Sequence, residues 1–462
     1  MSARHSASYW DSPTVFKLWP GRYTVAMNLL GAHKFGNPSL AITSLALLVA
    51  ITSTAAADSL IEAIIGGTPD VFLRYRYERV EDARPGLKRA YASTLRSALG
   101  YQTGAFHGFS AYGQFEDVHA IGQDRYNDGG ANEMIDRAVV VDPEDNEINQ
   151  AFLRFSGIPT TVVTYGRQEI THREAPLHRY VGNVLFRQNF QSFDALRVVN
   201  LSLPQTTIDY AYVWNVNRIF GEDNPLPDAS DFRMHSHFLN VQYGGLGFAK
   251  IEGYGYLLDF ESATAQRLST ATLGLRIQGD YVLAAKTKLT YAAEVANQRD
   301  FESNPNHVNV NYFAAELGLN RTIGGVIEAL GLRMNVELLG GKGGVQAFQT
   351  PLGTNHAFQG FADRFLVTPG DGIRDIFATI SMKALGAQFS TSYHVFNADR
   401  DNYRYGTEWD LLVERAFAKR FLVGLKYADY RADRNALNVT RNTASEQAFD
   451  LTKFWAYVQY KY

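Results

Sequence analysis

Apolar and polar residues alternate one by one along most of the chain after residue 70. In residues 70–80, leucine and tyrosine occupy the odd positions 73, 75 and 77, whereas Arg74, Arg76 and Glu78 occupy the even positions. Successive side chains of a β-strand point to opposite faces, so this alternation predicts a strand with one apolar and one charged face. About eighteen segments of this kind fill the chain. Clear further examples are residues 247–260, 287–298 and 330–338.

The links between the predicted strands alternate between short and long. Short links with turn residues occur near residues 102, 157, 203, 244, 322 and 385. Long polar links span residues 123–146, 171–193, 218–232, 342–372 and 431–447. A soluble β-sandwich also has alternating strands, but it has no reason to keep this order of link lengths. Short turns on one rim and long loops on the other are typical of an outer-membrane β-barrel, with periplasmic turns and extracellular loops.

The amino-terminal region predicts export rather than a membrane-spanning helix. Residues 40–51 hold about a dozen apolar residues, fewer than the roughly 20 that a spanning helix needs. Small residues at Ala55 and Ala57 follow, which predicts a signal peptide over residues 1–57, with Met27 as an alternative start of translation. The other interpretation of residues 40–51 is a buried core helix.

The mature chain is therefore predicted to be all-β: a transmembrane, antiparallel, up-and-down β-barrel of about 18 strands. The barrel would span residues 70–462, and residues 58–69, with a short helix at 59–64, would form a periplasmic amino-terminal segment. A lipid bilayer offers no partner for backbone amides, so only helices or closed barrels can cross it. The last strand ends on the aromatic residue Tyr462, where phenylalanine is usual. Such an end resembles the signal that the barrel-assembly machinery binds.

Composition excludes several classes of protein. The chain of 462 residues has no cysteine, which excludes a disulfide scaffold, a thiolate metal site and a cysteine nucleophile. The formal net charge of -3 gives no reason to expect nucleic acid as a partner.

Five segments are more distinctive than the alternation. They are YGRQEI from Tyr165, HRYVGNVLFRQNFQSFDA from His178, YVWNVNRIFG from Tyr212, FQTPLGTNHAFQGFADRFL from Phe348 and YGTEWDL from Tyr405. Taken in order, the segments resemble the alginate export family of outer-membrane β-barrels, over essentially all of residues 58–462. The resemblance implies an eighteen-stranded, monomeric channel whose extracellular loops fold over the lumen. It also implies the outer membrane of a Gram-negative bacterium as the location, with the lipid bilayer, lipopolysaccharide and the barrel-assembly machinery as partners.

Members of this family that export alginate use an arginine-rich lumen, and many relatives resemble general porins. If the charged face of each strand points inward, the candidate pore-lining residues are Arg74, Arg76, Glu78, Arg96, Glu116, Arg154, Arg167, Arg187, Gln188, Asn189, Lys250, Arg276, Arg333 and Glu337. Cations and carboxylates nearly balance over all the inward positions, which weakens the case for a polyanion because charge selectivity needs an excess of one sign. The alternative is that these residues pair across neighbouring strands, for example Arg74, Arg76 and Arg96 with Glu78 and Glu116.

Two long loops are candidates to narrow the lumen. Residues 171–193 carry several cations and amides but only Glu174 as an acid, so an inward pose would give an electropositive constriction. The alternative is a loop that docks on the outer rim. Residues 342–372 contain four phenylalanines among glycines and predict a second inward lid or, alternatively, a self-packed Ω-loop.

Metal sites have little support in the sequence, and no other cofactor is expected. Acidic residues gather in residues 117–146, including Asp124, Asp128, Asp136, Asp142, Glu144 and Asp145. They could bind Ca²⁺ in an extracellular loop, although their spacing matches no EF-hand and a solvated loop is the alternative. His235 and His237 would share one face of a strand, but no third ligand is evident.

These observations predict an outer-membrane channel for the passive diffusion of small anionic or saccharide solutes. The main alternative is a secretion channel for alginate or another polyuronate. A lipase-type barrel enzyme needs a nucleophile, base and orienting group, but no G-x-S-x-G or similar motif occurs, so we expect no enzyme. A structural barrel plugged by its own loops is the remaining alternative.

Overall fold

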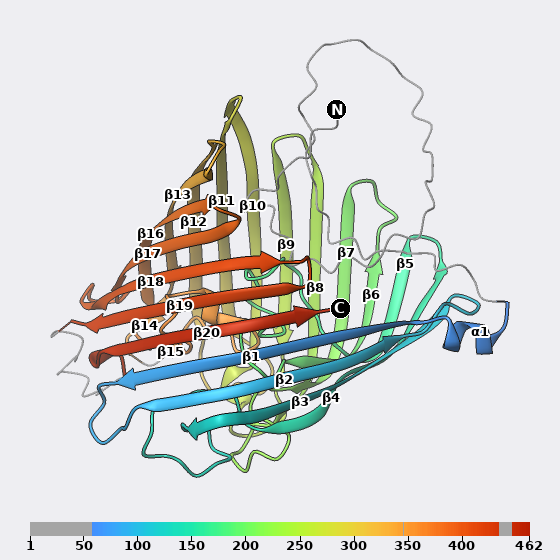
Figure 1. The fold of residues 1–462 in the computed structure, drawn as a ribbon, viewed down its shortest axis with the longest axis horizontal. Coiled ribbons are helices and arrows are strands. Elements are labelled where there is room, and N and C mark those ends of the chain that lie inside the picture. The colour runs from blue at the N-terminus through green and yellow to red at the C-terminus, as the bar shows by residue number, and fades with distance from the viewer. Residues whose placement is uncertain (1–57, 345, 434–445) are drawn as a thin grey trace.

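The computed structural model describes residues 58–344, 346–433 and 446–462. Eighteen strands form one closed antiparallel sheet, a β-barrel (Figure 1). They are β1 (Thr68–Asp82), β2 (Ala90–Gln102), β3 (Phe109–Arg125), β4 (Asp145–Ile158), β5 (Thr161–Gln168), β6 (Ser192–Asn200), β7 (Thr206–Asn217), β8 (Asp231–Leu246), β9 (Ala249–Leu258), β10 (Thr270–Ala284), β11 (Thr287–Asp300), β12 (Asn309–Thr322), β13 (Ile327–Leu339), β16 (Ile373–Ala384), β17 (Ala387–Asn397), β18 (Arg404–Phe417), β19 (Phe421–Ala432) and β20 (Leu451–Lys461). The predicted fold is confirmed.

Pairing of the first and last strands closes the barrel. β1 runs antiparallel to β20, with Arg76 opposite Tyr457, and each other strand pairs with its neighbours in sequence. At the carboxyl end, Tyr462 exchanges two backbone hydrogen bonds with Val71, at 2.9 and 3.3 Å. Closure leaves no free sheet edge, as a spanning sheet requires.

The alternating faces lie as the sequence predicts. Arg74, Arg76 and Glu78 of β1 point into the barrel and are at most 7% exposed, whereas Tyr75 between them is 38% exposed. The outer wall is apolar, with Leu273 and Met334 among its most exposed side chains. One-residue alternation therefore separates a charged interior from an outer surface suited to lipid.

The order of short and long connections is also confirmed. Short turns join β4 to β5, β10 to β11 and β16 to β17, and the last of these uses left-handed backbone at Leu385 (φ 55°) and Gly386 (φ 71°). The long connections lie at the opposite rim, where residues 126–144, 169–191, 218–230 and 340–372 join successive strands. Two successive residues with left-handed backbone conformation suit a two-residue hairpin, because the twist of such a turn matches the twist of the strands.

Helices are few. At the rim of the short turns lies α1 (Leu60–Ile65), whose amino end carries a capping box between Ser59 and Glu62. The other helical pieces among the described residues are the 3₁₀ turns η2 (Gln266–Leu268), η3 (Asn355–Ala357) and η4 (Glu446–Ala448). Across the described ranges, no helix has both the length and the apolar character needed to cross a membrane. The predicted signal peptide and part of the loop 431–447 lie outside the described residues.

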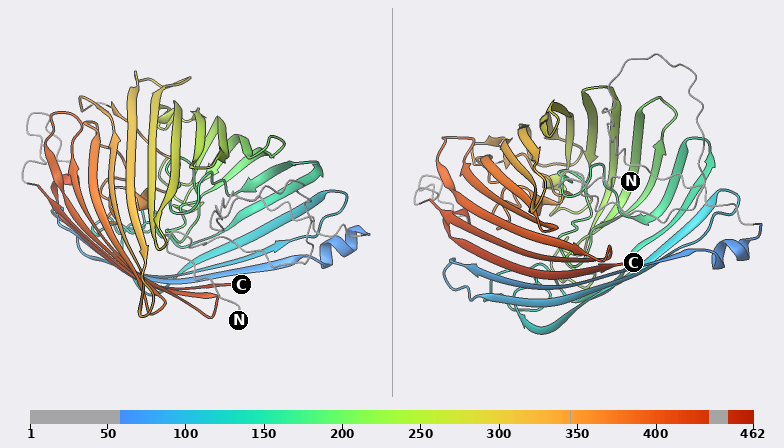
Figure 2. Two further views of the ribbon diagram at one scale, coloured as in Figure 1. Left: turned by 90° about the horizontal axis from the view of Figure 1, so that it is seen from above. Right: turned by 45° about the horizontal axis from the view of Figure 1, so that its top comes forward.

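Long loops occupy the interior of the barrel (Figure 2). Residues 340–372 include the small ribbon β14 (Gly341–Lys342) and β15 (Gln346–Ala347). Side chains of the wall and of these loops form a buried apolar cluster that contains Phe193, Phe348 and Trp455. The charged strand faces point inward, but this cluster adds apolar packing between loops and wall that fills part of the lumen.

Candidate pore and its inward loops

Two loops enter the lumen and contact each other there. We call residues 169–191, between β5 and β6, the first inward loop, and residues 340–372, between β13 and β16, the second inward loop. The amide of Gly182 donates to the carbonyl of Leu352 at 3.0 Å, and the amide of Thr354 donates to the carbonyl of His178 at 2.8 Å. The inward pose predicted for both loops is therefore observed.

Three wall arginines bind backbone carbonyls of the first inward loop. Arg74 donates to the carbonyl of Leu185 at 2.6 Å, and Arg96 donates to that of Gln188 at 2.5 Å. Arg76 donates to the carbonyl of Phe186. A guanidinium presents several donors in a fixed fork, so one arginine can hold more than one acceptor. These cations hold the loop instead of pointing into an open bore.

Carboxylates hold the amide groups of the same segment. Asp142 accepts from the amide of Gln188 at 3.0 Å, and Glu116 accepts from the amide of Phe190 at 3.2 Å. The side-chain amide of Asn189 donates to the carbonyl of Pro143 at 3.0 Å. Backbone carbonyls and backbone amides in residues 185–190 therefore both have partners on the wall or on another loop. These hydrogen bonds fix the position of the segment.

Ion pairs connect these wall groups with each other. Arg96 pairs with Glu116 at 2.5 Å, so the pairing alternative weighed for these two residues is observed. Arg76 pairs with Asp142 and lies 3.7 Å from Glu78. Sequence reasoning assigned Asp142 to a solvated or Ca²⁺-binding loop and missed its role as the buried partner of Arg76. No local pattern signals a pairing between residues 66 positions apart.

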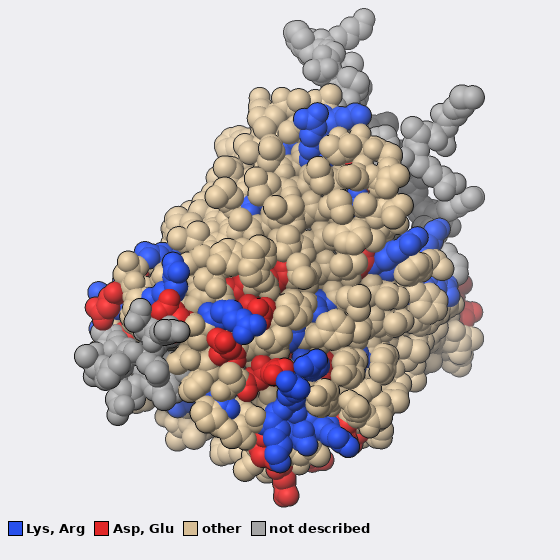
Figure 3. Space-filling view, turned by 60° about the vertical axis from the view of Figure 1, so that its left-hand side comes forward, with Lys and Arg blue, Asp and Glu red and all other residues tan. Residues whose placement is uncertain are grey.

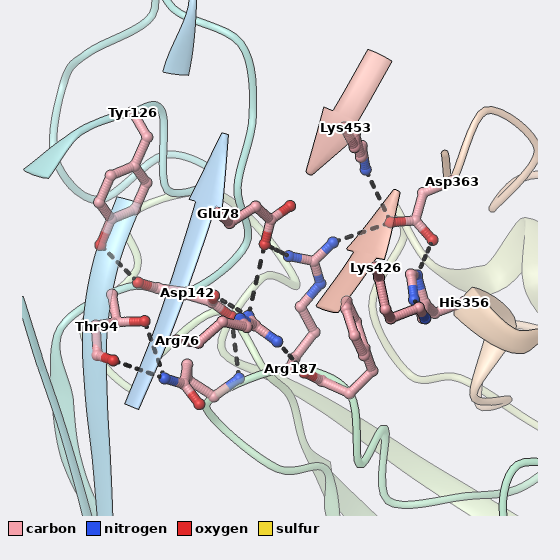
Figure 4. Close-up of polar contacts among 12 residues, drawn as sticks. Arg76, Glu78, Thr94, Tyr126, Asp142, Arg187, His356, Asp363, Lys426 and Lys453 are labelled. Atoms are coloured by element: carbon pink, nitrogen blue, oxygen red, sulfur yellow. Dashed lines mark hydrogen bonds and ion pairs between the residues drawn. The ribbon is translucent and has the colours of Figure 1, made fainter. Parts of the chain in front are cut away.

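Arg187 links the two inward loops (Figure 4). Its guanidinium lies 3.2 Å from Glu78 and 3.0 Å from Asp363 of the second inward loop. Asp363 also contacts His356 at 2.7 Å and Lys453 at 2.8 Å. Burial alone would raise the pKa of Asp363, but His356, Lys453 and Arg187 together hold it well below its usual value.

His356 lies at the contact between the two loops and the wall. Its ring stacks on Phe186 of the first inward loop, with 3.5 Å between ring centroids, and its Nε2 lies 2.7 Å from Nζ of Lys426. Burial lowers the pKa of His356 well below its usual value, and the neighbouring Lys426 ammonium acts in the same direction. A neutral His356 can therefore donate to Asp363 and accept from Lys426.

The other arginines of the first inward loop are paired too. Arg173 contacts Glu252 at 3.0 Å and Glu294 at 2.8 Å, and Arg179 contacts Glu337 at 3.1 Å. The predicted electropositive constriction needs correction on this point: the loop folds inward, but carboxylates neutralise its arginines. The excess of basic residues within the loop gave no information about acids on distant strands.

Two histidines of the first inward loop are buried. Burial lowers the pKa of His172 to about 4, and Asp209, 3.7 Å away, opposes this shift only in part. Burial likewise lowers the pKa of His178 to about 4. Both side chains are therefore neutral near pH 7.

The other predicted pore-lining residues include Arg276, Arg333 and Lys250. Arg276 contacts Glu294 at 2.9 Å, and Arg333 contacts Glu316 at 3.4 Å. Lys250 lies at the turn end of β9, beside Ala249. Most of the predicted set therefore lies on the inner wall.

The prediction that Arg167 lines the pore is wrong. It shares the outer face of β5 with Tyr165, which is 59% exposed, and contacts Asp194 at 3.0 Å and Glu222 at 3.4 Å at the loop rim. Alternation stays regular through residues 161–168, so Arg167 lies on the face of Tyr165; its charge, and not its place in the alternation, had suggested the inner side.

The metal hypotheses gain no support from the geometry. In the part of the chain that the structure describes, no group of three or more histidines and carboxylates could hold a metal ion. One carboxylate oxygen of Asp128 accepts from the amides of Gly130, Ala131 and Asn132 in its own turn. His235 contacts Tyr212 at 2.9 Å, and His237 contacts Tyr210 at 2.8 Å, on the outer face of the barrel.

The loop end of the barrel carries mixed charge. Figure 3 shows acidic and basic side chains side by side at this end, and uncharged side chains on the adjoining wall. Exposed pairs such as Lys88 with Asp136, at 2.6 Å, contribute to this pattern. The outer charges therefore form no large field of one sign on the face that the figure shows.

The closed eighteen-stranded barrel with loops folded into its lumen defines a porin-type outer-membrane fold. Solved structures with this fold include OccAB4 of Acinetobacter baumannii, with a TM-score of 0.63, 11% sequence identity, and coverage of 86% of this chain and 98% of that one. OpdK of Pseudomonas aeruginosa with vanillate gives a TM-score of 0.60 at 13% identity and covers 86% and 99%. OccK9 (OpdG) of Pseudomonas aeruginosa gives 0.63 at 12% identity, with the same coverage.

At these identities the similarity establishes the fold. No family model matches the sequence. No curated protein matches it either. The resemblance to the alginate export family therefore stays a prediction.

Proposed function

We propose that this protein is a channel in the outer membrane of a Gram-negative bacterium and passes small anionic solutes by passive diffusion. The observation that carries the proposal is the distribution of charge. Ionised side chains line the inner wall around two loops that narrow the lumen, and apolar side chains cover the outer wall. A structure of the same fold was solved with vanillate, a small aromatic carboxylate, which supports this class of solute.

A route for solutes past the inward loops needs those loops to move or to leave a narrow passage. Their contacts are polar in part, and each arginine that holds them is also a group that could bind a carboxylate. A small solute could exploit a narrow passage, whereas a wide polymer could not. The proposal therefore includes small anions and, second, small saccharides.

A secretion channel for alginate or another polyuronate is the second candidate. The wall arginines favour it, because uronic acids carry carboxylates. Against it, Arg74, Arg76 and Arg96 hold the first inward loop and Arg187 is paired twice, so few cations face a passing polymer. We propose no catalytic role.

The proposed setting follows from the fold and from the sequence predictions. A signal peptide of residues 1–57 would direct export, and the barrel-assembly machinery would insert the barrel beside lipopolysaccharide. The single closed sheet of one chain supports a monomer as the working unit.

Planar-bilayer recording tests the proposed function. The purified barrel is expected to give ohmic current steps, and a salt gradient is expected to give a reversal potential of weak anion preference. Silence at all voltages would contradict a channel, and a strong cation preference would contradict the anionic solutes. Liposome-swelling rates with benzoate and with alginate oligomers would separate the small-anion channel from the polyuronate channel.

A further inference from the structure

Arg154 of β4 is a lumen arginine that the loops do not use. Within the described residues its guanidinium has no hydrogen-bond or ion-pair partner, and its Nε atom is buried without one. Its recorded contact is with the ring of Phe152, 5.0 Å from the guanidinium carbon. Arg154 as a whole is only half-buried, so the rest of its guanidinium is accessible and is expected to meet water or an anion.

Arg154 belongs to a polar row across three strands. In the register of the sheet it lies opposite Thr164 of β5, and Thr164 in turn lies opposite Arg197 of β6. Directly opposite residues have Cβ atoms about 5 Å apart, so the two arginines flank the threonine hydroxyl. Asp209 neutralises Arg197 through contacts of 2.9 and 2.5 Å, which leaves the row with one positive charge.

This row lines a cavity of about 80 Å³ on the inner wall of β4, β5 and β6. A water molecule needs about 10–15 Å³ on this measure, so the cavity holds several waters or one small organic anion. Phe152, Val162 and Val199 add apolar surface beside the charged row. Arg154 lies four residues from the turn end of β4, which places the cavity on the turn side of the first inward loop.

Glu169 lies at the other end of the same cavity. It accepts from the side-chain amide of Asn149 at 3.0 Å and from that of Asn183, so its carboxylate is held in place. A second negative charge on a ligand would meet this carboxylate. The cavity therefore combines one cation without a direct ion-pair partner, a hydroxyl, an apolar wall and an acid that disfavours dianions.

We propose that this cavity is a binding subsite for a small monocarboxylate with an apolar body. Arg154 holds the carboxylate, Thr164 donates its hydroxyl to it, and Phe152 contacts the apolar body. The proposal rests on the proposed function, because it names the class of anion that the channel passes. It places a resting point for that anion on the turn side of the inward loops.

Calorimetric titration of the full barrel in detergent tests the subsite. The probes are benzoate, the uncharged benzyl alcohol and the dianion phthalate. Benzoate is expected to bind the native barrel more tightly than either other probe. Arg154→Gln is expected to weaken benzoate binding at least tenfold, whereas Arg154→Lys, which keeps the charge but not the fork, gives a smaller loss.

A matched control removes another lumen arginine. Arg333 of β13 contacts Glu316, so Arg333→Gln is expected to change benzoate binding by less than twofold. Glu169→Gln is expected to strengthen phthalate binding relative to benzoate. Folding of each variant is checked by the heat-dependent shift of the barrel in gel electrophoresis. If Arg154→Gln does not fold, Thr164→Val and Arg154→Lys carry the test, and both must weaken benzoate binding.

The outcomes separate the subsite from the channel. Benzoate binding that is absent from the native barrel, or unchanged in Arg154→Gln, overturns the subsite even when bilayers show an anion-preferring channel. Binding that depends on Arg154 in a barrel that passes no current supports the subsite and overturns the proposed function.

Discussion

Arg187 and Asp363 join the two inward loops across the lumen, with 3.0 Å between Nη2 and Oδ2. Their side chains are only 6% and 3% exposed. Breaking a buried ion pair by removing one partner costs about 3–5 kcal/mol, because the other charge stays buried. Asp363→Asn is therefore expected to release the second inward loop and to raise single-channel conductance in planar bilayers.

The control for this prediction is an exposed pair. Lys88 and Asp136 lie 2.6 Å apart but are 65% and 52% exposed, and such pairs contribute about 0–1 kcal/mol. Lys88→Gln is expected to leave conductance unchanged. Equal conductance in Asp363→Asn and the native barrel would show that this link does not hold the loops.

Arg74 offers a test of the backbone contacts without breaking an ion pair. Its guanidinium donates to the carbonyls of Leu185 and Arg187 and to the side chain of Gln188 at 2.8 Å. Hydrogen bonds to a charged group contribute about 1.5–3 kcal/mol each. Arg74→Gln is expected to make the segment 185–190 accessible to trypsin at Arg187, as judged by mass spectrometry, while barrel folding is retained. Continued protection of Arg187 would refute the holding role of Arg74.

Acid is expected to loosen the first inward loop. The pKa of His172 and of His178 is about 4 in the folded loop and about 6.5 when exposed. A histidine with a lowered pKa favours the folded loop fully above pH 6.5, and this contribution falls as the pH drops toward 4. At pH 4.5 the loss is about 2–3 kcal/mol for each histidine.

The measurement is single-channel conductance between pH 7.5 and pH 4.5. Conductance is expected to rise below pH 6.5, and the double variant His172→Gln, His178→Gln is expected to reduce this rise. The pKa of Asp363 is held well below its usual value, so Asp363 keeps its charge over this pH range. It is therefore expected to contribute nothing to the change in conductance. An identical pH profile in the double variant would exclude the two histidines as the cause.

Chelation is expected to have no effect on the channel. Asp142 pairs with Arg76, and Asp128 accepts from three amides of its own turn, so these acids of the loop already have partners. Conductance and thermal stability are expected to be equal in EDTA and in 1–5 mM Ca²⁺, concentrations at or above the dissociation constants of extracellular calcium modules, about 10⁻⁴–10⁻³ M. A shift of the thermal midpoint on adding Ca²⁺ would revive the calcium site.

Assembly is expected to depend on the aromatic ring of Tyr462, which follows β20. Tyr462 exchanges backbone hydrogen bonds with Val71, and its side chain is 47% exposed on the outer wall. Tyr462→Phe is expected to assemble like the native chain, because it keeps the ring. Tyr462→Ala is expected to lower the amount of folded barrel in outer-membrane fractions, and normal yield in this variant would contradict the role of the ring.

The alternating pattern predicts the strands and the barrel because both follow from local geometry. Side chains of neighbouring residues point to opposite faces, so Arg74 and Arg76 had to share the inner face of β1 once lipid covers the other. Arg167 shows the limit of this reasoning, since its charge suggested the inner face although its place in the alternation, two residues after Tyr165, puts it on the outside.

The partners of the charged residues could not be predicted in the same way. Arg187 meets Asp363 over a separation of 176 residues, and Arg76 meets Asp142 over 66. Such contacts depend on how the long loops fold within the barrel. The sequence of one loop does not predict which distant residue it will contact. The resemblance to the alginate export family favoured the inward position of the first inward loop, and the composition of the loop predicted its positive charge but not the acids that neutralise it.

Arg74, Arg76 and Arg96 donate hydrogen bonds to backbone carbonyls, and this choice of acceptor has an evolutionary consequence. Every residue type supplies a carbonyl, so substitutions at Leu185 and Phe186 leave these acceptors in place. Relatives of this chain could therefore vary the side chains that the anchored segment presents while its course through the barrel stays constant. Diversification of the solutes that pass would then require no redesign of the barrel.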